Sequence, residues 1–450
     1  MLLPPSPDLS PTQQGLAWLT RPYDFLRECA AAHGDAFTLD LGVHGTYVLF
    51  SRPEAIREIF TGDPRALHAG KGNQVLRPFL GAHSLLLLEE QEHLAERRML
   101  LPAFHGKRIA SHGETIHALV LDHIRGWTPG APLDVQDAMQ KLTLEVILRV
   151  VFGLEDGDAL RLLRGHLQRF LNDPKFNLAL IGELDGELGE SESWRAFRNL
   201  FAEIRHLIDA QVRHRRAQAT AAPEDVLGMM LQARRDDGRA LDDEELRDEL
   251  VTLVVTGYET TATALAWSFY WIDRVPEARR RLTELLSDRP LDDALREPYL
   301  EAFCKEVLRI HPVIPVVARQ VQKRVEITGH VIDPGVTVAP CIYLTHHRED
   351  IYEAPDEFRP SRFLERKFDP YEYLPFGGGA RRCIGMPLAL WEMKAVLSAV
   401  VPHWRLTLPE GVRVRPVRRS VTVAPSGGPR LTLEPRHARS AQPGEPSHER

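Results

Sequence analysis

Hydrophobic residues recur three and four positions apart along most of the chain from about Pro22 to Pro312. This spacing places them on one face of a helix, and it is clear in the stretches AMQKLTLEVILRVVFGL (138–154) and EELRDELVTLVVTGYETTATALAWSFYWI (244–272). Strand-like alternation is confined to residues 37–51, 325–340 and 430–435, which Gly and Pro punctuate and which we expect to form hairpins. The pattern predicts a mainly α protein with a small β region.

No change of composition and no low-complexity linker divides the body of the chain, so we expect a single domain over residues 1–435. The last segment, RHARSAQPGEPSHER (436–450), is polar and aperiodic. Such a composition buries too little apolar surface to offset the entropy of ordering, so this tail is predicted to be disordered.

The segment from Leu250 to Ile272 is long and apolar enough to be mistaken for a membrane span. It carries several threonines and a glutamate near its middle, which are costly to bury in lipid, so a helix inside the protein core is favoured. Thr252, Thr256 and Thr260 lie four positions apart and therefore share one face of that helix. The sequence predicts a core wall that carries a stripe of hydroxyl groups.

Composition excludes several classes of protein. The 450 residues are 43% hydrophobic and 26% charged, which is ordinary for a globular chain with a large core. The net charge of -7 and the pI near 6.3 give no basic surface for nucleic acid. The start, MLLPPSPDLSPTQQGLAWL, resembles neither a secretory signal nor a membrane anchor, so we expect a cytoplasmic protein without a membrane span.

Cysteine is scarce, and one of the four has unusual surroundings. Cys29, Cys304 and Cys341 stand in ordinary apolar segments, whereas Cys383 lies in FGGGARRCIG (376–385), among glycines and arginines and before a helical pattern. A buried free thiol is the commonest interpretation of a single cysteine. A nucleophile would need a partner base that is not apparent, and the glycines match no phosphate-binding motif.

Metal ligation explains more of the motif. A thiolate at a helix N-terminus is favoured by backbone N–H groups and by the helix dipole, which lower the thiol pKa. Glycine lets the backbone approach a flat, bulky group, and arginine pairs with anions. A haem has a planar ring, two propionates and an iron with open axial positions, and so meets all three requirements.

The same residues resemble the cysteine-ligand loop of the cytochrome P450 family of haem-thiolate monooxygenases. Phe376, Gly379, Arg381, Cys383 and Gly385 match every position of the family pattern FxxGxRxCxG. The resemblance extends over nearly the whole chain and implies the single, mostly helical fold of that family. It also implies haem b, with the Cys383 thiolate as the axial ligand of the iron.

Two helical residues three apart, Glu306 and Arg309 in KEVLRIHP, match the family's ExxR pair. Alone, such a pair is commonly a solvated surface pair of little energetic weight. It is followed by APDEFRPSRF, where Arg362 occupies the arginine of the family's PxxFxPxRF segment. The resemblance implies a buried carboxylate bound to two guanidinium groups, with a structural role in folding and haem retention.

The segment TGYETT resembles the family's motif (A/G)Gx(D/E)T(T/S) on the long helix, although Thr256 stands where Ala or Gly is usual. A mid-helix threonine commonly bonds back to its own helix. In the family interpretation Gly257 weakens the helix, the hydroxyl of Thr260 is released, and Glu259 and Thr260 are the catalytic pair that delivers protons during oxygen activation.

A third family feature is the HxxxR helix, matched by His93 and Arg97 in EEQEHLAERRMLLPAF. The resemblance assigns both residues to a haem propionate, together with Arg319 of PVIPVVAR and Arg381 of the cysteine loop. A lone His and Arg on a helix are usually surface residues, and Arg98 is expected to remain in solvent.

The implied reaction inserts one oxygen atom of O2 into a C–H or C=C bond of a hydrophobic small molecule such as a fatty acid, terpenoid, steroid or polyketide. The chain carries no dinucleotide fingerprint and no iron–sulfur cysteine set, so electrons are expected from a separate ferredoxin or flavodoxin with its reductase. A basic docking patch for this acidic carrier is predicted at Arg98, Lys107, Arg108, Arg382 and Lys394.

The pocket for the substrate is expected to be mainly aliphatic. By position in the family it draws on residues 68–88, 170–184 and 420–428, and on Leu253, Thr256, Gly257, Ile314, Val316 and Val317. Two other functions remain open: a haem-thiolate enzyme that uses peroxide directly, and a sensor or binding protein without turnover. The Glu259–Thr260 pair argues against the first, because peroxide chemistry needs no staged proton delivery.

Overall fold

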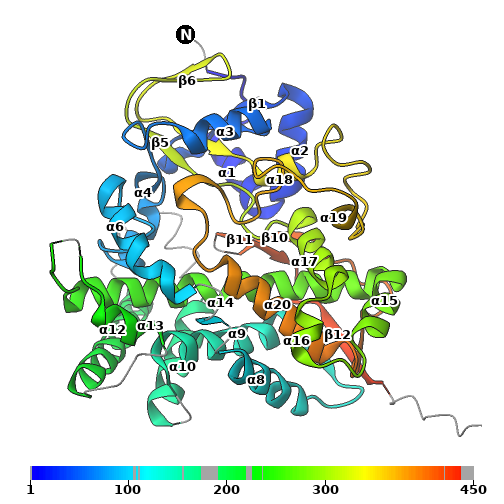
Figure 1. Ribbon diagram of the computed structural model, residues 1–450. Coiled ribbons are helices and arrows are strands. Elements are labelled where there is room, and N and C mark those ends of the chain that lie inside the picture. Colours follow the sequence, from blue (N-terminus) through cyan, green and yellow to red (C-terminus); the bar gives the residue numbers. More distant parts are fainter. Residues whose placement is uncertain are drawn as a thin grey trace, which may run out of the picture.

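The computed structural model describes residues 3–104, 108–109, 112–154, 157–173, 191–218, 225–235, 237–419 and 421–436. Figure 1 shows a mostly helical molecule in which α14 crosses the middle, with the small strands gathered mainly above it and at one side. The predicted fold class, mainly α with a small β region in one domain, is confirmed. The predicted tail beyond residue 436 lies outside the described residues.

The helices before and including the central one are α1 (Pro11–Thr20), α2 (Pro22–His33), α3 (Pro53–Thr61), α4 (Ala69–Gly72), α5 (Arg77–Leu80), α6 (Glu90–Leu100), α8 (Gly113–Arg125), α9 (Val135–Phe152), α10 (Asp158–Leu171), α12 (Glu192–Ala217), α13 (Val226–Gln232) and α14 (Asp243–Arg274). Those that follow are α15 (Pro276–Leu286), α16 (Leu291–Leu295), α17 (Pro298–Ile310), α18 (Ile342–His346), α19 (Arg362–Glu365) and α20 (Met386–Val400), with short 3-10 turns such as η5 (Gly379–Arg381).

Local sequence explains where the functional helices begin. The carboxylate of Asp242 accepts the backbone N–H groups of Glu244 and Glu245 and so caps α14, while the Glu245 side chain returns the bond to the cap. Proline at the first turn starts α17 and α20, where its missing N–H has no intrahelical partner to lose. The core wraps around α14, which packs along α9 and also contacts α12, α17 and α20.

The strands are β1 (Ala36–Asp40), β2 (Thr46–Phe50), β3 (Leu67–His68), β4 (Pro132–Asp134), β5 (Arg319–Val321), β6 (Val325–Ile327), β7 (His330–Ile332), β8 (Thr337–Pro340), β9 (Trp404–Thr407), β10 (Pro416–Arg419), β11 (Thr422–Pro425) and β12 (Arg430–Pro435). They form one five-stranded sheet in the order β1-β2-β8-β5-β3 and three small sheets.

The predicted hairpins are right in part. Strands β1 and β2 pair antiparallel, as the alternation in 37–51 predicts, and so do β6 and β7. Strand β8, at the end of the predicted hairpin segment 325–340, does not join the β6–β7 hairpin but pairs in parallel with β2. Strand β12 pairs with the distant strands β4 and β9 rather than with a neighbour in sequence. Alternation reports which side of a strand is buried, but it does not report the partner strand.

Within the described part of the chain, no helix has both the length and the apolarity to cross a lipid bilayer. The long segment that resembles a span is the interior of α14, whose Thr252, Glu259 and Thr263 are buried inside the protein. This agrees with the interpretation of Leu250–Ile272 as a core helix.

Candidate functional site

The cysteine loop packs directly on helix α3. A Cβ on Gly378 would lie 2.6 Å from Cδ2 of Phe60, and one on Gly379 would lie 2.5 Å from the carbonyl oxygen of Phe60. Gly379 also has φ of +63°, which side chains rarely tolerate. Phe60 thus requires glycine at 378 and 379, whereas a Cβ on Gly377 would meet nothing within 4 Å and one on Gly385 only the Cys383 sulfur, at 3.9 Å. Gly377, Gly378 and Gly385 line the cavity, so the approach of a flat group stays a prediction for these three.

The Cys383 side chain opens into an internal cavity of about 1050 Å³, which Phe376 and Gly385 also line. The backbone N–H of Cys383 donates to the carbonyl of Phe376 at 3.0 Å, which closes the loop before α20 begins. Burial raises the pKa of the thiol, while the backbone N–H groups of Gly385 and Met386 and the Arg97 guanidinium act to lower it. The helix N-terminus therefore acts in the predicted direction, but burial outweighs it.

Four basic side chains line one part of this cavity: His93, Arg97, Arg319 and Arg381. Burial and the three arginines lower the pKa of His93 to about 3, so the imidazole is neutral. Burial lowers the pKa of Arg319 and of Arg381 to about 10 each, even though Arg381 forms an ion pair with Glu89 at 2.7 Å. Among the described residues, Glu89 is the carboxylate that forms an ion pair with one of these four side chains, so the cluster keeps an excess of positive charge.

A haem fits this arrangement. The cavity has a thiol on one wall and, elsewhere, the guanidinium groups of Arg97 and Arg319, which form no ion pair with a carboxylate among the described residues, as a porphyrin with an axial ligand and two propionates requires. Arg97 lies close enough to the sulfur for each to shift the pKa of the other. Seven of the eight residues predicted to contact the haem line the cavity: His93, Arg97, Arg319, Phe376, Arg381, Cys383 and Gly385. The eighth, Gly379, packs against Phe60 instead.

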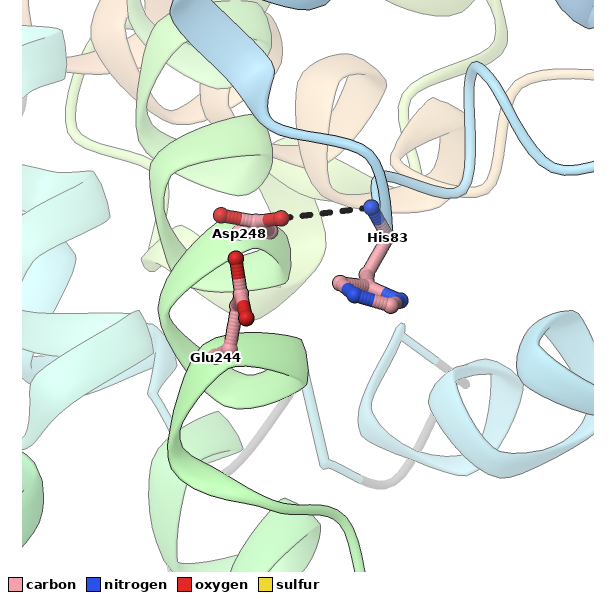
Figure 2. A group of neighbouring side chains, drawn as sticks. All are labelled: His83, Glu244 and Asp248. Atoms are coloured by element: carbon pink, nitrogen blue, oxygen red, sulfur yellow. Dashed lines mark hydrogen bonds between the residues drawn. The ribbon is translucent and has the colours of Figure 1, made fainter.

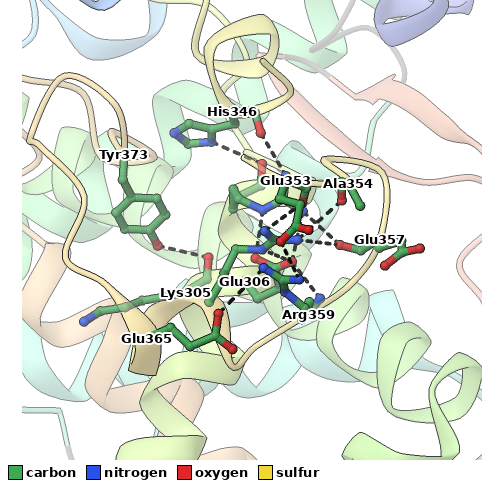
Figure 3. Close-up of polar contacts among 11 residues, drawn as sticks. Lys305, Glu306, His346, Glu353, Ala354, Glu357, Arg359, Glu365 and Tyr373 are labelled. Carbon is green, nitrogen blue, oxygen red and sulfur yellow. Dashed lines mark hydrogen bonds and ion pairs between the residues drawn. The ribbon is translucent and has the colours of Figure 1, made fainter. Parts of the chain in front are cut away.

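Behind the loop, Glu306 binds two arginines in a region without solvent. Its carboxylate accepts Nε and Nη2 of Arg309 at 2.8 and 2.9 Å and Nε of Arg362 at 3.0 Å. The backbone N–H of Arg359 donates to the same carboxylate at 2.8 Å. Figure 3 shows Glu306 at the centre of this network, beside the backbone carbonyls that receive the remaining guanidinium N–H groups. The geometry matches the sequence expectation of one carboxylate between two arginines.

The paired residues of TGYETT lie where α14 meets the cavity. Burial raises the pKa of Glu259 to about 7, although Arg419 at 3.5 Å and a hydrogen bond from Thr422 both favour its ionised form. The Thr260 hydroxyl donates to the carbonyl of Thr256 at 2.9 Å, and α14 is continuous through Gly257. The expected release of this hydroxyl from the helix is wrong, since the helix keeps its bond.

Gly257 has a packing role. A Cβ at this position would lie 2.8 Å from Cδ1 of Ile147 on α9, so glycine lets the two core helices approach closely.

The hydroxyls of Thr252, Thr256 and Thr260 each donate to the carbonyl four residues earlier, so the predicted stripe of hydroxyl groups exists, with its protons bonded to the helix backbone. Their oxygens can still accept a hydrogen bond.

The residues predicted to line the substrate pocket all line the cavity: Leu253, Thr256, Gly257, Ile314, Val316 and Val317. Parts of segments 68–88 and 420–428 contribute as well, whereas residues 174–184 and 420 lie outside the described residues. Sequence reasoning missed two buried acids of the lining, Glu249 on α14 and Glu392 on α20. The sequence could have indicated both, because each is an acidic residue within a helix that the motifs had already assigned to the site.

A second polar cluster lies at the N-terminal end of α14. Within the described residues, His83, Glu244 and Asp248 have ligand atoms within 4.8 Å of one another (Figure 2). The Asp248 carboxylate accepts the backbone N–H of His83 at 3.2 Å, and Arg205 approaches it at 3.7 Å. This cluster attaches the loop that contains His83 to α14.

Comparison with known proteins agrees with the geometry. Residues 4–432 match the family model described as "Cytochrome P450". The chain is 36% identical over 435 residues, 96% of its length and 92% of the relative, to the Mycobacterium tuberculosis protein named "Putative cytochrome P450 135B1". It is 30% identical over 404 residues, 90% of its length and 84% of the relative, to the protein named "Putative cytochrome P450 137" of the same species.

Solved structures show the same fold. The haem domain of cytochrome P450DA superposes with a TM-score of 0.85 at 25% identity, over 97% of this chain and 98% of that one. The structure titled "Retinoic acid bound cyanobacterial CYP120A1" superposes with a TM-score of 0.82 at 22% identity, over 96% of this chain and 99% of that one. The chain therefore belongs to the cytochrome P450 family of monooxygenases, which use haem b with a cysteine thiolate ligand.

Proposed function

We propose that this chain inserts one oxygen atom of O2 into a C–H or C=C bond of an apolar small molecule, with electrons from a separate ferredoxin or flavodoxin and its reductase. The observation that carries the proposal is the opening of the Cys383 thiol into a cavity of about 1050 Å³ whose remaining wall is largely aliphatic. The haem would occupy part of this volume, and the aliphatic remainder suits a fatty acid, terpenoid, steroid or polyketide.

The bound haem supplies the oxygen-activating and electron-accepting chemistry. Cys383 would hold the iron through its sulfur, with the amides of Gly385 and Met386 favouring the thiolate form. Arg97, Arg319 and Arg381 would pair with the propionates, and His93 would add an N–H donor. Glu306 with its two arginines maintains the backbone behind the cysteine loop.

Glu259 is the proton carrier of the site. A carboxyl group with a pKa of about 7 both releases and recovers a proton near neutral pH, which general acid–base catalysis requires. Its neighbour Arg419 is partly exposed, so the carboxyl group lies between solvent and the cavity. The oxygen of Thr260 accepts a hydrogen bond in the cavity while its proton remains on the carbonyl of Thr256.

The visible spectrum of the reduced protein under carbon monoxide tests the proposal. We expect the red-shifted Soret band that thiolate ligation produces, and then displacement of an iron-bound water when a library of apolar compounds is titrated. Reductant consumption must also rise when a binding compound is added. A colourless folded protein contradicts the haem assignment, and binding without consumption of reductant identifies a sensor instead of an oxygenase.

A further inference from the structure

The carboxyl group of Glu249 lines the cavity without a hydrogen-bond partner among the described residues. The residue is 0% exposed, and neither carboxylate oxygen forms a hydrogen bond to protein. Burial and the nearby Glu96 raise its pKa, while the backbone N–H of Leu85 lies near enough to lower it without meeting the geometry of a hydrogen bond. An unsatisfied buried polar group costs about 1–3 kcal/mol, so it requires an explanation.

The groups that face Glu249 give it no ion-pair partner among the described residues. Glu96 on α6 and Asp248 on α14 are acidic, and both raise the pKa of Glu249. The only cation acting on it is Arg235, among the residues the structure describes, and this guanidinium contacts Glu96 and Glu245 at 3.0 Å each. Because burial and these acids favour the protonated form of Glu249, its carboxyl group offers one O–H donor and one accepting oxygen. A ligand hydroxyl satisfies both, a protonated amine pairs with the ionised form, and an ether oxygen meets only the O–H.

The position of Glu249 on α14 defines the length of such a ligand. Glu249, Leu253, Thr256 and Thr260 are spaced by four, three and four residues, so they lie on the same face of the helix and all line the cavity. With a rise of 1.5 Å per residue, the eleven residues from Glu249 to Thr260 span roughly 16 Å along the helix axis. Glu249 and the proton-delivering end of the site are therefore far apart.

The wall beside Glu249 is held in place by two contacts. The hydroxyls of Ser84 and Thr252 are hydrogen-bonded at 2.8 Å, with the Thr252 oxygen free to accept because its own proton is on the Asp248 carbonyl. The Asp248 carboxylate accepts the backbone N–H of His83 (Figure 2). These contacts attach the 83–86 loop, which includes Leu85, to the same turns of α14 that carry Glu249. The end of the cavity at Glu249 is thus a formed structure.

We propose that Glu249 binds a hydrogen-bond donor, a hydroxyl or a protonated amine, at one end of an elongated apolar substrate, so that a carbon remote from that donor reaches Thr260 and Cys383. This inference rests on the proposed monooxygenase function and adds the chemistry and length of the substrate. It assigns Glu249 a role in specificity, distinct from the proton-carrying role of Glu259.

Four probes of one length test the inference on the haem-loaded protein: dodecanol, dodecylamine, dodecyl methyl ether and dodecane. Dissociation constants are measured from the change in visible absorbance and from the shift in thermal midpoint. At least one donor probe is expected to bind about tenfold more tightly than the ether, which only accepts hydrogen bonds. The tighter of the alcohol and the amine identifies the donor.

Two variants and a control separate this role from a structural one. Glu249→Leu should abolish the preference for the donor probe without lowering the thermal midpoint, because it removes an unsatisfied polar group, and Glu249→Gln should reduce the preference. Glu392→Gln, a second buried acid of the cavity lining that lies on α20, should keep it.

The inference is overturned if neither donor probe binds the unaltered protein more tightly than the ether, whether or not the other probes bind. It is equally overturned if Glu249→Leu and Glu249→Gln both keep the full preference. These results leave the carbon monoxide spectrum unchanged, so they are distinguishable from failure of the proposed function, in which that spectrum is absent.

Discussion

The Glu306 carboxylate and the Arg362 guanidinium, 56 positions apart in the chain, meet at 3.0 Å where neither has contact with solvent. Arg309 occupies the second side of the same carboxylate, so one buried anion connects α17 to the segment that leads to the cysteine loop. Removing the anion leaves two guanidinium groups in an environment that cannot solvate them.

We expect Glu306→Gln to lower the free energy of unfolding by about 3–5 kcal/mol, the cost of stranding a buried charge. Urea titration followed by circular dichroism measures this change, and the yield of haem-loaded protein should fall with it. The matched control is Glu301→Gln on the same helix, where the carboxylate pairs with Lys305 at a half-exposed site and is worth less than about 1 kcal/mol. Equal losses in the two variants would contradict the buried-network role.

Cys383→Ser is expected to remove the thiolate signature from the spectrum of the reduced carbon monoxide complex, because a hydroxyl is not a thiolate donor. The other cysteines provide the control. Cys304→Ser changes a thiol that is buried away from the cavity, so it should reduce stability while leaving the spectrum unaltered in whatever protein folds. A spectrum that survives serine at position 383 would refute the assignment of the ligand.

Arg97→Leu should weaken haem retention, since this guanidinium lines the cavity and forms no ion pair with a carboxylate among the described residues. We expect transfer of haem to an excess of apomyoglobin to become at least tenfold faster, equivalent to about 1.4 kcal/mol. Arg98→Leu, at the exposed neighbouring position, should transfer haem at the unaltered rate. Similar rates for the two variants would remove Arg97 from the propionate site.

The raised pKa of Glu259 predicts a definite pH dependence of stability. The folded state holds the Glu259 proton more tightly than the unfolded state does. The protonated carboxyl group therefore adds to the free energy of unfolding below its unfolded pKa near 4.5, and this contribution is lost as pH rises through about 7. At about 1.4 kcal/mol per pKa unit, the loss amounts to about 3 kcal/mol. Glu259→Gln should therefore gain stability relative to the unaltered protein as pH rises, and parallel urea midpoints across this range would contradict the prediction.

The same carboxyl group predicts the outcome of turnover. Thr260→Ala should keep the haem spectrum but divert electrons to peroxide or water. In the unaltered protein, coupled turnover should fall as pH rises through about 7, because Glu259 loses the proton that it delivers. Glu259→Gln should abolish this pH dependence. Product formed per electron consumed is the measurement for both. An unchanged ratio in Thr260→Ala would show that this hydroxyl, which is bonded back to Thr256, takes no part in proton delivery.

The predicted docking patch for an electron carrier is described in part. Arg98 and Arg382 are exposed, Lys394 donates to the carbonyl of Leu295 at 2.8 Å, and Lys107 lies outside the described residues. Arg382→Glu should slow reduction by an acidic carrier and flatten its dependence on ionic strength. Arg324→Glu, on the exposed β6–β7 hairpin, should leave both quantities unaltered.

The sequence alone determined the features that are local in the chain. Helical periodicity, the caps of α14 and the alternation in β1 and β2 depend on neighbours a few residues away, so they can be read directly from residue order. The spacing of Cys383 within its loop and of Glu306 before Arg309 is equally local. These motifs identified the family and predicted many of the residues that line the cavity, but not Glu249 and Glu392.

Tertiary structure decided what depends on a partner distant in the chain. Phe60 explains Gly378 and Gly379, Ile147 explains Gly257, and Arg419 approaches Glu259 from a strand 160 residues away. Pairing of β8 with β2 and of β12 with β4 follows from packing, because period-two alternation is satisfied by any partner strand. The pKa of Glu259, and a Glu249 carboxyl group that has no hydrogen-bond partner in the described part of the chain, arise from burial, which exists only after distant helices have met.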